Sequence, residues 1–144
     1  MLAIGSAYGA DGIGWQLAEQ LSERGIANVY SCRHPIDLLP YFQTYRHCIV
    51  IDAVWADHLA DSQLIEIKPN ELSAEYCPNS HSLTLYEVIQ LAGISGQLPQ
   101  RIQIIGINIA KRAGRTFNVS EINALTEQLM DQWVSTTTGF YLNP

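Results

Sequence analysis

The sequence has little charge and almost no clustering of one sign. Its 144 residues include only 8 lysines and arginines against 14 aspartates and glutamates, for a formal net charge of −6. Because no basic cluster offsets this acidic balance, we do not expect a nucleic-acid-binding surface. No apolar run approaches the roughly 20 residues needed to cross a bilayer, so we expect no membrane partner either.

Cysteines are also few. Cys32, Cys48 and Cys77 are odd in number and widely spaced, which excludes both a disulfide framework and a C-x-x-C metal knuckle. Reduced thiols are typical of the cytosol. The sequence starts MLAIG, without the charged start and long apolar stretch of a signal peptide. We therefore expect a cytoplasmic protein.

Apolar segments, by contrast, are abundant, and hydrophobic residues make up 47% of the chain. Runs typical of buried strands alternate with helical patterns, such as Ile13, Leu17 and Leu21 at a spacing of four. This order predicts one domain over residues 1–144, an α/β three-layer sandwich with a twisted, largely parallel sheet of the phosphorylase/hydrolase-like kind. Strands are expected at residues 2–4, 27–32, 48–51, 63–68 and 101–105.

Three polar residues fall where predicted strands end and helices begin. Asp11 lies between the first strand and the first helix, Asp52 directly follows the strand from Cys48 to Ile51, and His81 opens a helix expected after Ser80. In a parallel sheet such positions share one edge, where sites form. Two carboxylates and an imidazole suit a borderline divalent metal with open coordination positions, or general acid–base chemistry if one carboxyl is held protonated.

Each of these residues also has an ordinary structural explanation. Asp11 is a good helix N-cap, Asp52 can accept hydrogen bonds from loop amides, and His81 can be a solvated histidine. The glycines of the first loop suggest a phosphate-binding turn, but their order, Gly-x-x-Gly-x-Gly, differs from the dinucleotide fingerprint. The residue types alone leave these alternatives open.

At the same positions the sequence resembles the hydrogenase maturation protease family. The stretch from Gly5 to Gly14 (GSAYGADGIG) is similar to the family's opening motif, Gly-Asn-x-x-x-x-Asp-[Asp/Glu]-Gly-x-Gly. The apolar strand ending in Asp52-Ala53, the Ser-His pair at residues 80–81, the Asp-Leu-Leu turn at residues 37–39 and the glycine-bearing strand at residues 104–107 follow in the family's order. The departures are Ser6 for Asn, Ala10 for the first Asp, and no proline in the late strand motif.

The resemblance implies an aspartyl-type or metal-dependent endopeptidase that removes the C-terminal extension of a nickel-loaded [NiFe]-hydrogenase large-subunit precursor. By motif position, Asp11, Asp52 and His81 are its catalytic and metal-binding residues, with the nickel carried by the substrate. We assign Gly12, Gly14 and Asp37 to substrate binding, with helix–sheet packing as the alternative role of the two glycines. The alternative function is a non-catalytic nickel-dependent chaperone or a small-ligand or nucleotide-binding module of the same fold.

Overall fold

A five-stranded sheet forms the centre of the computed structural model, which describes residues 1–72 and 83–134. Its order is β2-β1-β3-β5-β4, with the first four strands parallel and β4 antiparallel to β5. The strands are β1 (Leu2–Ile4), β2 (Tyr30–Cys32), β3 (His47–Val54), β4 (Leu64–Ile67) and β5 (Arg101–Asn108). The largely parallel sheet is as predicted.

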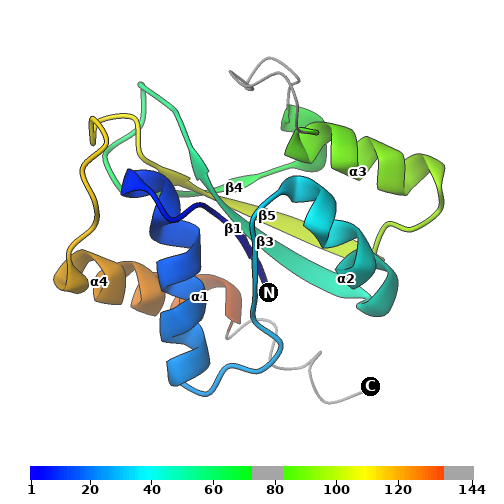
Figure 1. Ribbon diagram of the computed structural model, residues 1–144, viewed down its shortest axis with the longest axis horizontal. Coiled ribbons are helices and arrows are strands. Elements are labelled where there is room, and N and C mark those ends of the chain that lie inside the picture. Colours follow the sequence, from blue (N-terminus) through cyan, green and yellow to red (C-terminus); the bar gives the residue numbers. More distant parts are fainter. Residues whose placement is uncertain (73–82, 135–144) are drawn as a thin grey trace.

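Helices cover both faces of this sheet, and Figure 1 shows them as two groups on opposite sides. One group comprises α1 (Ile13–Glu23) and α4 (Val119–Leu129), which continues as a π-helical turn over Met130–Val134. The other comprises α2 (Leu39–Thr44) and α3 (Leu85–Ile94). The three-layer architecture is therefore confirmed.

Strand β3 illustrates why a central strand reads as a continuous apolar run. Ile49 and Ile51 pack in the core beneath α1 and α4, whereas Cys48 and Val50 pack in the core beneath α2 and α3. Because successive side chains point to opposite faces of a sheet, a strand covered on both sides needs apolar residues at every position.

Capping residues set the starts of the last two helices. Asn118 accepts a hydrogen bond from the backbone of Glu121, and Thr84 accepts one from the backbone of Glu87. The capping box at Asn118 was predicted. The helix that we expected directly after Ser80 begins instead at Leu85, because Thr84 supplies its N-cap.

Three predicted strand boundaries were wrong by three residues each, and the ends of β4 and the start of β3 differ by one residue. Strand β2 begins at Tyr30 rather than residue 27, because Asn28 has a left-handed backbone with φ of 57°. Strand β3 continues past Ile51 to Val54, so Asp52 lies within the strand, close to its carboxyl end. Strand β5 passes through Gly106 and ends at Asn108, since both neighbouring strands pair with this stretch.

In the described parts of the chain, none of the helices has the length and hydrophobicity needed to cross a membrane.

Candidate functional site

Asp11 lies in the connection between β1 and α1, as the sequence indicated. This connection contains a short 3₁₀ helix, η1 (Gly9–Gly12), and α1 starts at the next residue. Gly12 is the N-cap of α1, and no side chain caps that helix end. The exposed Asp11 carboxylate therefore does not act as the N-cap, which leaves it available for another role.

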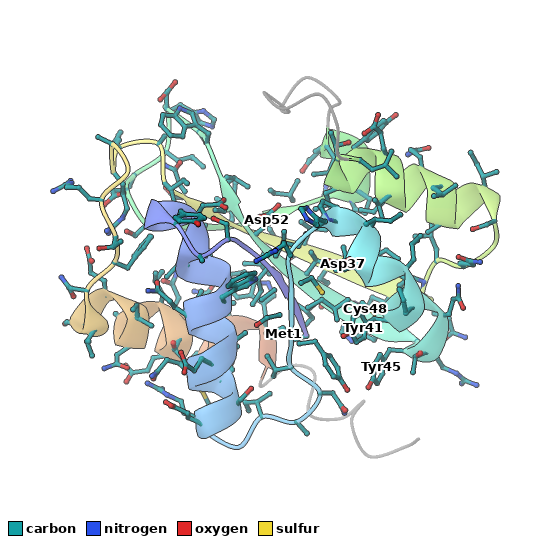
Figure 2. All side chains as sticks on the ribbon, viewed as in Figure 1. Met1, Asp37, Tyr41, Tyr45, Cys48 and Asp52 are labelled. Carbon is teal, nitrogen blue, oxygen red and sulfur yellow. The ribbon has the colours of Figure 1, made fainter. Side chains whose placement is uncertain are left out.

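Asp52 is half-buried near the carboxyl end of β3. Burial, and then the negative charge of Asp11, raise the pKa of the Asp52 carboxyl from 3.8 to about 7. A like charge has this effect only when it lies close to the group that it perturbs. Because β1 and β3 are adjacent and parallel, Asp11 after β1 and Asp52 near the end of β3 lie at the same carboxyl edge of the sheet, where Figure 2 labels Asp52.

The surroundings of Asp52 explain its desolvation. Its partner across the β3–β5 pairing is Gly106, which has no side chain. A Cβ atom at Gly106 would lie 2.9 Å from the methyl groups of Ile67 and of Val54. These apolar side chains fill the space beside Gly106 and favour the neutral carboxylic acid, whereas a backbone hydrogen bond from Ala53 has a smaller effect in the opposite direction.

His81 lies outside the described residues, so its assignment as a ligand stays a prediction. Among residues 1–72 and 83–134, no three histidine, cysteine, aspartate or glutamate side chains come close enough to hold a metal ion. Asp11 and Asp52 offer two oxygen ligands, which would leave most positions around a divalent ion open to a substrate. Burial raises the pKa of Cys32 and of Cys48 to about 11, so neither is a ready thiolate ligand.

Packing accounts for the glycines of the first loop. A Cβ atom at Gly14 would lie 2.2 Å from the carbonyl oxygen of Ile4, and one at Gly12 would lie 2.9 Å from that of Ser6. The absence of side chains lets α1 approach the end of β1 closely. This supports helix–sheet packing as the role of Gly12 and Gly14. Their contact with a substrate polypeptide stays a prediction.

Asp37 also has a local role. Its carboxylate accepts hydrogen bonds from the backbone N–H groups of Arg33 and His34 at 3.1 and 2.9 Å. These bonds hold the turn between β2 and the 3₁₀ helix η2 (Pro35–Leu38). Figure 2 labels both Asp37, which follows β2, and Asp52, and the parallel strands β2 and β3 both end at the carboxyl edge of the sheet. Its role in substrate binding remains a prediction.

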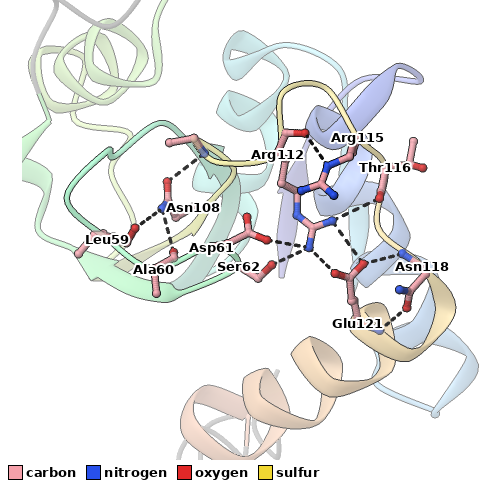
Figure 3. A network of polar contacts seen from close by, with 11 residues as sticks. Leu59, Ala60, Asp61, Ser62, Asn108, Arg112, Arg115, Thr116, Asn118 and Glu121 are labelled. Atoms are coloured by element: carbon pink, nitrogen blue, oxygen red, sulfur yellow. Dashed lines mark hydrogen bonds and ion pairs between the residues drawn. The ribbon is translucent and has the colours of Figure 1, made fainter.

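Sequence reasoning missed Asn108, which organises the loop that follows Asp52. The fully buried Asn108 side chain accepts a hydrogen bond from the N–H of Ala56 and donates to the carbonyl oxygens of Leu59 and Ala60 (Figure 3). It therefore fixes the path of the chain just after β3. The signal in the sequence was the apolar pattern of Ile105 and Ile107, which continues past Gly106 and ends at this asparagine.

A buried arginine connects the loop after β3 to the first turn of α4. Arg112, only 3% exposed, donates to Glu121 at 2.6 Å and to the hydroxyl of Ser62 at 2.8 Å, and it lies 3.2 Å from the carboxylate of Asp61 (Figure 3). Its guanidinium also lies over the ring of Phe117, 3.5 Å from the centroid. The loops after β3 and β5 and the start of α4 are thus held as one unit.

The chain is an α/β three-layer domain with a largely parallel sheet. Two carboxylates, Asp11 and Asp52, lie at the carboxyl edge of this sheet, and the pKa of Asp52 is raised. No family model matches the sequence, and no curated protein matches it.

Solved structures are more informative. The chain superimposes on an endopeptidase from Escherichia coli with a TM-score of 0.73 at 19% identity, over 96% of this chain and 90% of the other. The hydrogenase maturating endopeptidase HybD from the same organism gives 0.72 at 18% identity, over the same shares. The [NiFe] hydrogenase maturation protease HycI from Thermococcus kodakarensis gives 0.62 at 18%, over 90% and 85%. The chain therefore has the fold of the hydrogenase maturation endopeptidases, which confirms the resemblance at the level of fold.

Proposed function

We propose that the chain is a cytoplasmic endopeptidase that removes the C-terminal extension of a nickel-loaded [NiFe]-hydrogenase large-subunit precursor. The observation that carries the proposal is the placement of Asp11 and Asp52 at the carboxyl ends of the adjacent parallel strands β1 and β3. The names of the structurally similar proteins, which state hydrogenase maturation and endopeptidase activity, support the same reaction.

The raised pKa of Asp52 suits proton transfer in peptide hydrolysis. With a pKa of about 7, the carboxyl exists in both forms near neutral pH. The ionised form can accept a proton from the attacking water, and the neutral form can return a proton to the departing amine. Asp11 keeps this balance by disfavouring a second full negative charge beside its own.

The nickel ion would be bound by the substrate and would arrive with it. A borderline ion binds thiolates more tightly than an open pair of carboxylates, so cysteines of the precursor would hold it. Asp11, Asp52 and His81 would contact the ion only when the loaded client docks, which would link binding to metal loading. Nickel there would act as a Lewis acid and is the alternative to a carboxylate base for activating water.

The Asp11→Asn variant separates this proposal from a non-catalytic chaperone of the same fold. For an endopeptidase we expect cleavage of the nickel-loaded precursor to fall by about 100-fold or more, while the precursor still binds. Cleavage is followed by the mass of the large subunit, and binding by co-elution. Wild-type protein that binds the precursor stably and never cuts it would identify a binding module instead.

A further inference from the structure

Strand β2 leaves one side of the sheet open in the part of the chain that the structure describes. Its only neighbour there is β1, to which it runs parallel. The N–H of Tyr30 donates to the carbonyl of Met1, and the carbonyl of Cys32 accepts from the N–H of Gly5. Because backbone groups alternate along a strand, the N–H and C=O of the exposed Ser31 point away from β1, toward the open side.

A groove of about 500 Å³ runs beside this open edge. On one side it is lined by Ser31 of β2 and by the flanking residues Val29 and Arg33, which alternate along the chain. On the other side it is lined by residues of α1: Trp15, Ala18, Glu19 and Ser22. The small side chains of Ala18 and Ser22 leave space in the middle of the groove. Trp15 and Val29 supply apolar surface, while Glu19 and Arg33 carry opposite charges.

One end of the groove lies at the first turn of α1 and the carboxyl end of β2, which border the candidate active site. At its upper end the indole N–H of Trp15 donates to the carbonyl of Cys32 at 2.9 Å, which joins the first turn of α1 to the end of β2. Asp11 lies directly before that turn, in η1. A chain lying in the groove would thus leave it at the carboxyl edge of the sheet, beside Asp11.

We propose that an extended segment of the client polypeptide pairs with β2 as an additional strand and is led by this groove to Asp11 and Asp52. The backbone groups of Ser31 identify the occupant, since an open strand edge is completed by another extended backbone. Glu19 and Arg33 balance in charge, so recognition rests on main-chain pairing and on apolar contact with Trp15 and Val29. This inference rests on the proposed endopeptidase function and names the substrate subsite of that reaction.

Two pairs of variants test the subsite. Ser31→Pro removes the N–H donor, whereas Ser31→Ala keeps it. Ser22→Trp fills the groove, whereas Glu23→Trp adds the same bulk at an exposed position of α1 that does not line it. With the nickel-loaded large-subunit precursor from the same genome as substrate, we expect Ser31→Pro and Ser22→Trp to raise KM about tenfold with kcat unchanged, as for the loss of one or two hydrogen bonds used in binding. The Glu23→Trp control should retain the wild-type KM, and Ser31→Ala should raise KM much less than Ser31→Pro does.

Hydrogen exchange supplies a readout that does not depend on cleavage. In the Asp11→Asn protein, the amide of Ser31 should exchange at least tenfold more slowly when the precursor is bound. If Ser31→Pro does not fold, Ser22→Trp and the exchange measurement decide the question. A wild-type KM in Ser22→Trp, or an unchanged Ser31 amide, would overturn the subsite and leave the endopeptidase proposal intact. A wild-type protein that cleaves no precursor would overturn both.

Discussion

Asp52 on β3 lies directly opposite Gly106 on β5 in the parallel register of the sheet. The methyl groups of Val54 and Ile67 occupy the space that a side chain at Gly106 would fill. The carboxyl of Asp52 therefore sits among apolar atoms on one side and near the charge of Asp11 on the other. The folded protein is therefore less stable when Asp52 is ionised, and this carboxyl titrates near neutral pH.

Replacing Asp52 by asparagine should stabilise the protein at high pH. Since its folded pKa of about 7 exceeds the ordinary value of 3.8, the folded state holds this proton more tightly than the unfolded state. Wild-type stability should then fall as pH rises from about 4 to about 7. We expect Asp52→Asn to exceed wild type by about 2 kcal/mol at pH 8, allowing for partial exposure, and by little at pH 4. Chemical denaturation at both pH values measures this, and parallel pH profiles would contradict it.

Removing the charge of Asp11 should lower the pKa of Asp52. The Asp11→Asn variant keeps the size of the side chain and abolishes the repulsion that disfavours ionised Asp52. The pKa should move toward its ordinary value but stay above it, because burial is the larger cause of the shift. A carboxyl-carbon NMR titration follows this directly. The exposed Asp57→Asn change serves as the control, and an Asp52 titration unaltered by Asp11→Asn would show that the two carboxylates are not neighbours.

Gly14→Val should destabilise the protein by about 3 kcal/mol or more. The new side chain would begin 2.2 Å from the carbonyl oxygen of Ile4 and would force α1 away from β1. Gly93→Ala is the matched helical control, since its Cβ would meet only the flexible tip of Leu98 at 3.4 Å. Thermal unfolding compares the two. If Gly14→Val loses cleavage but keeps its melting temperature, the glycine serves client approach rather than packing.

Arg112→Ala should cost about 2 kcal/mol, because it removes hydrogen bonds that the buried guanidinium makes to charged and polar partners. The guanidinium bridges Asp61, Ser62 and Glu121, so its loss also frees the loop after β3. Arg115→Ala is the control, since the side chain of Arg115 is exposed and, within residues 1–72 and 83–134, donates only to the carbonyl of Arg112. Urea denaturation should separate the variants clearly. Equal stabilities of the Arg112→Ala and Arg115→Ala variants would mean that the Arg112 network makes no net contribution to the free energy of unfolding.

Much of the fold could be predicted from local patterns. The strand from Cys48 to Ile51 and the helix marked by Ile13, Leu17 and Leu21 bury the faces that their periodicity requires, and these elements determine the layer architecture. Strand ends could not be predicted in the same way. Asp52 and Gly106 look like terminators in isolation, and only their pairing with each other across β3 and β5 extends both strands.

The site was predictable in part for a related reason. Asp11 follows β1 and Asp52 lies near the end of β3, and parallel strands bring their carboxyl ends to one edge, so the shared location of the two residues follows from topology. The role of Asn108 does not, because its hydrogen bonds reach a loop about 50 residues earlier in the chain, a contact that depends on the assembled sheet. The left-handed backbone at Asn28 was likewise hidden within an apolar stretch.

We propose that this chain cuts a hydrogenase precursor only after nickel has been loaded. The direct measurement is to incubate the purified protein with nickel-free and nickel-loaded large-subunit precursor and to follow loss of the C-terminal extension by mass spectrometry. We predict that only the loaded form is shortened, with no tightly bound nickel in the isolated protein, because Asp11 and Asp52 alone make an open site. Equal cleavage of both forms, or stoichiometric nickel retained by the isolated protein, would contradict the account.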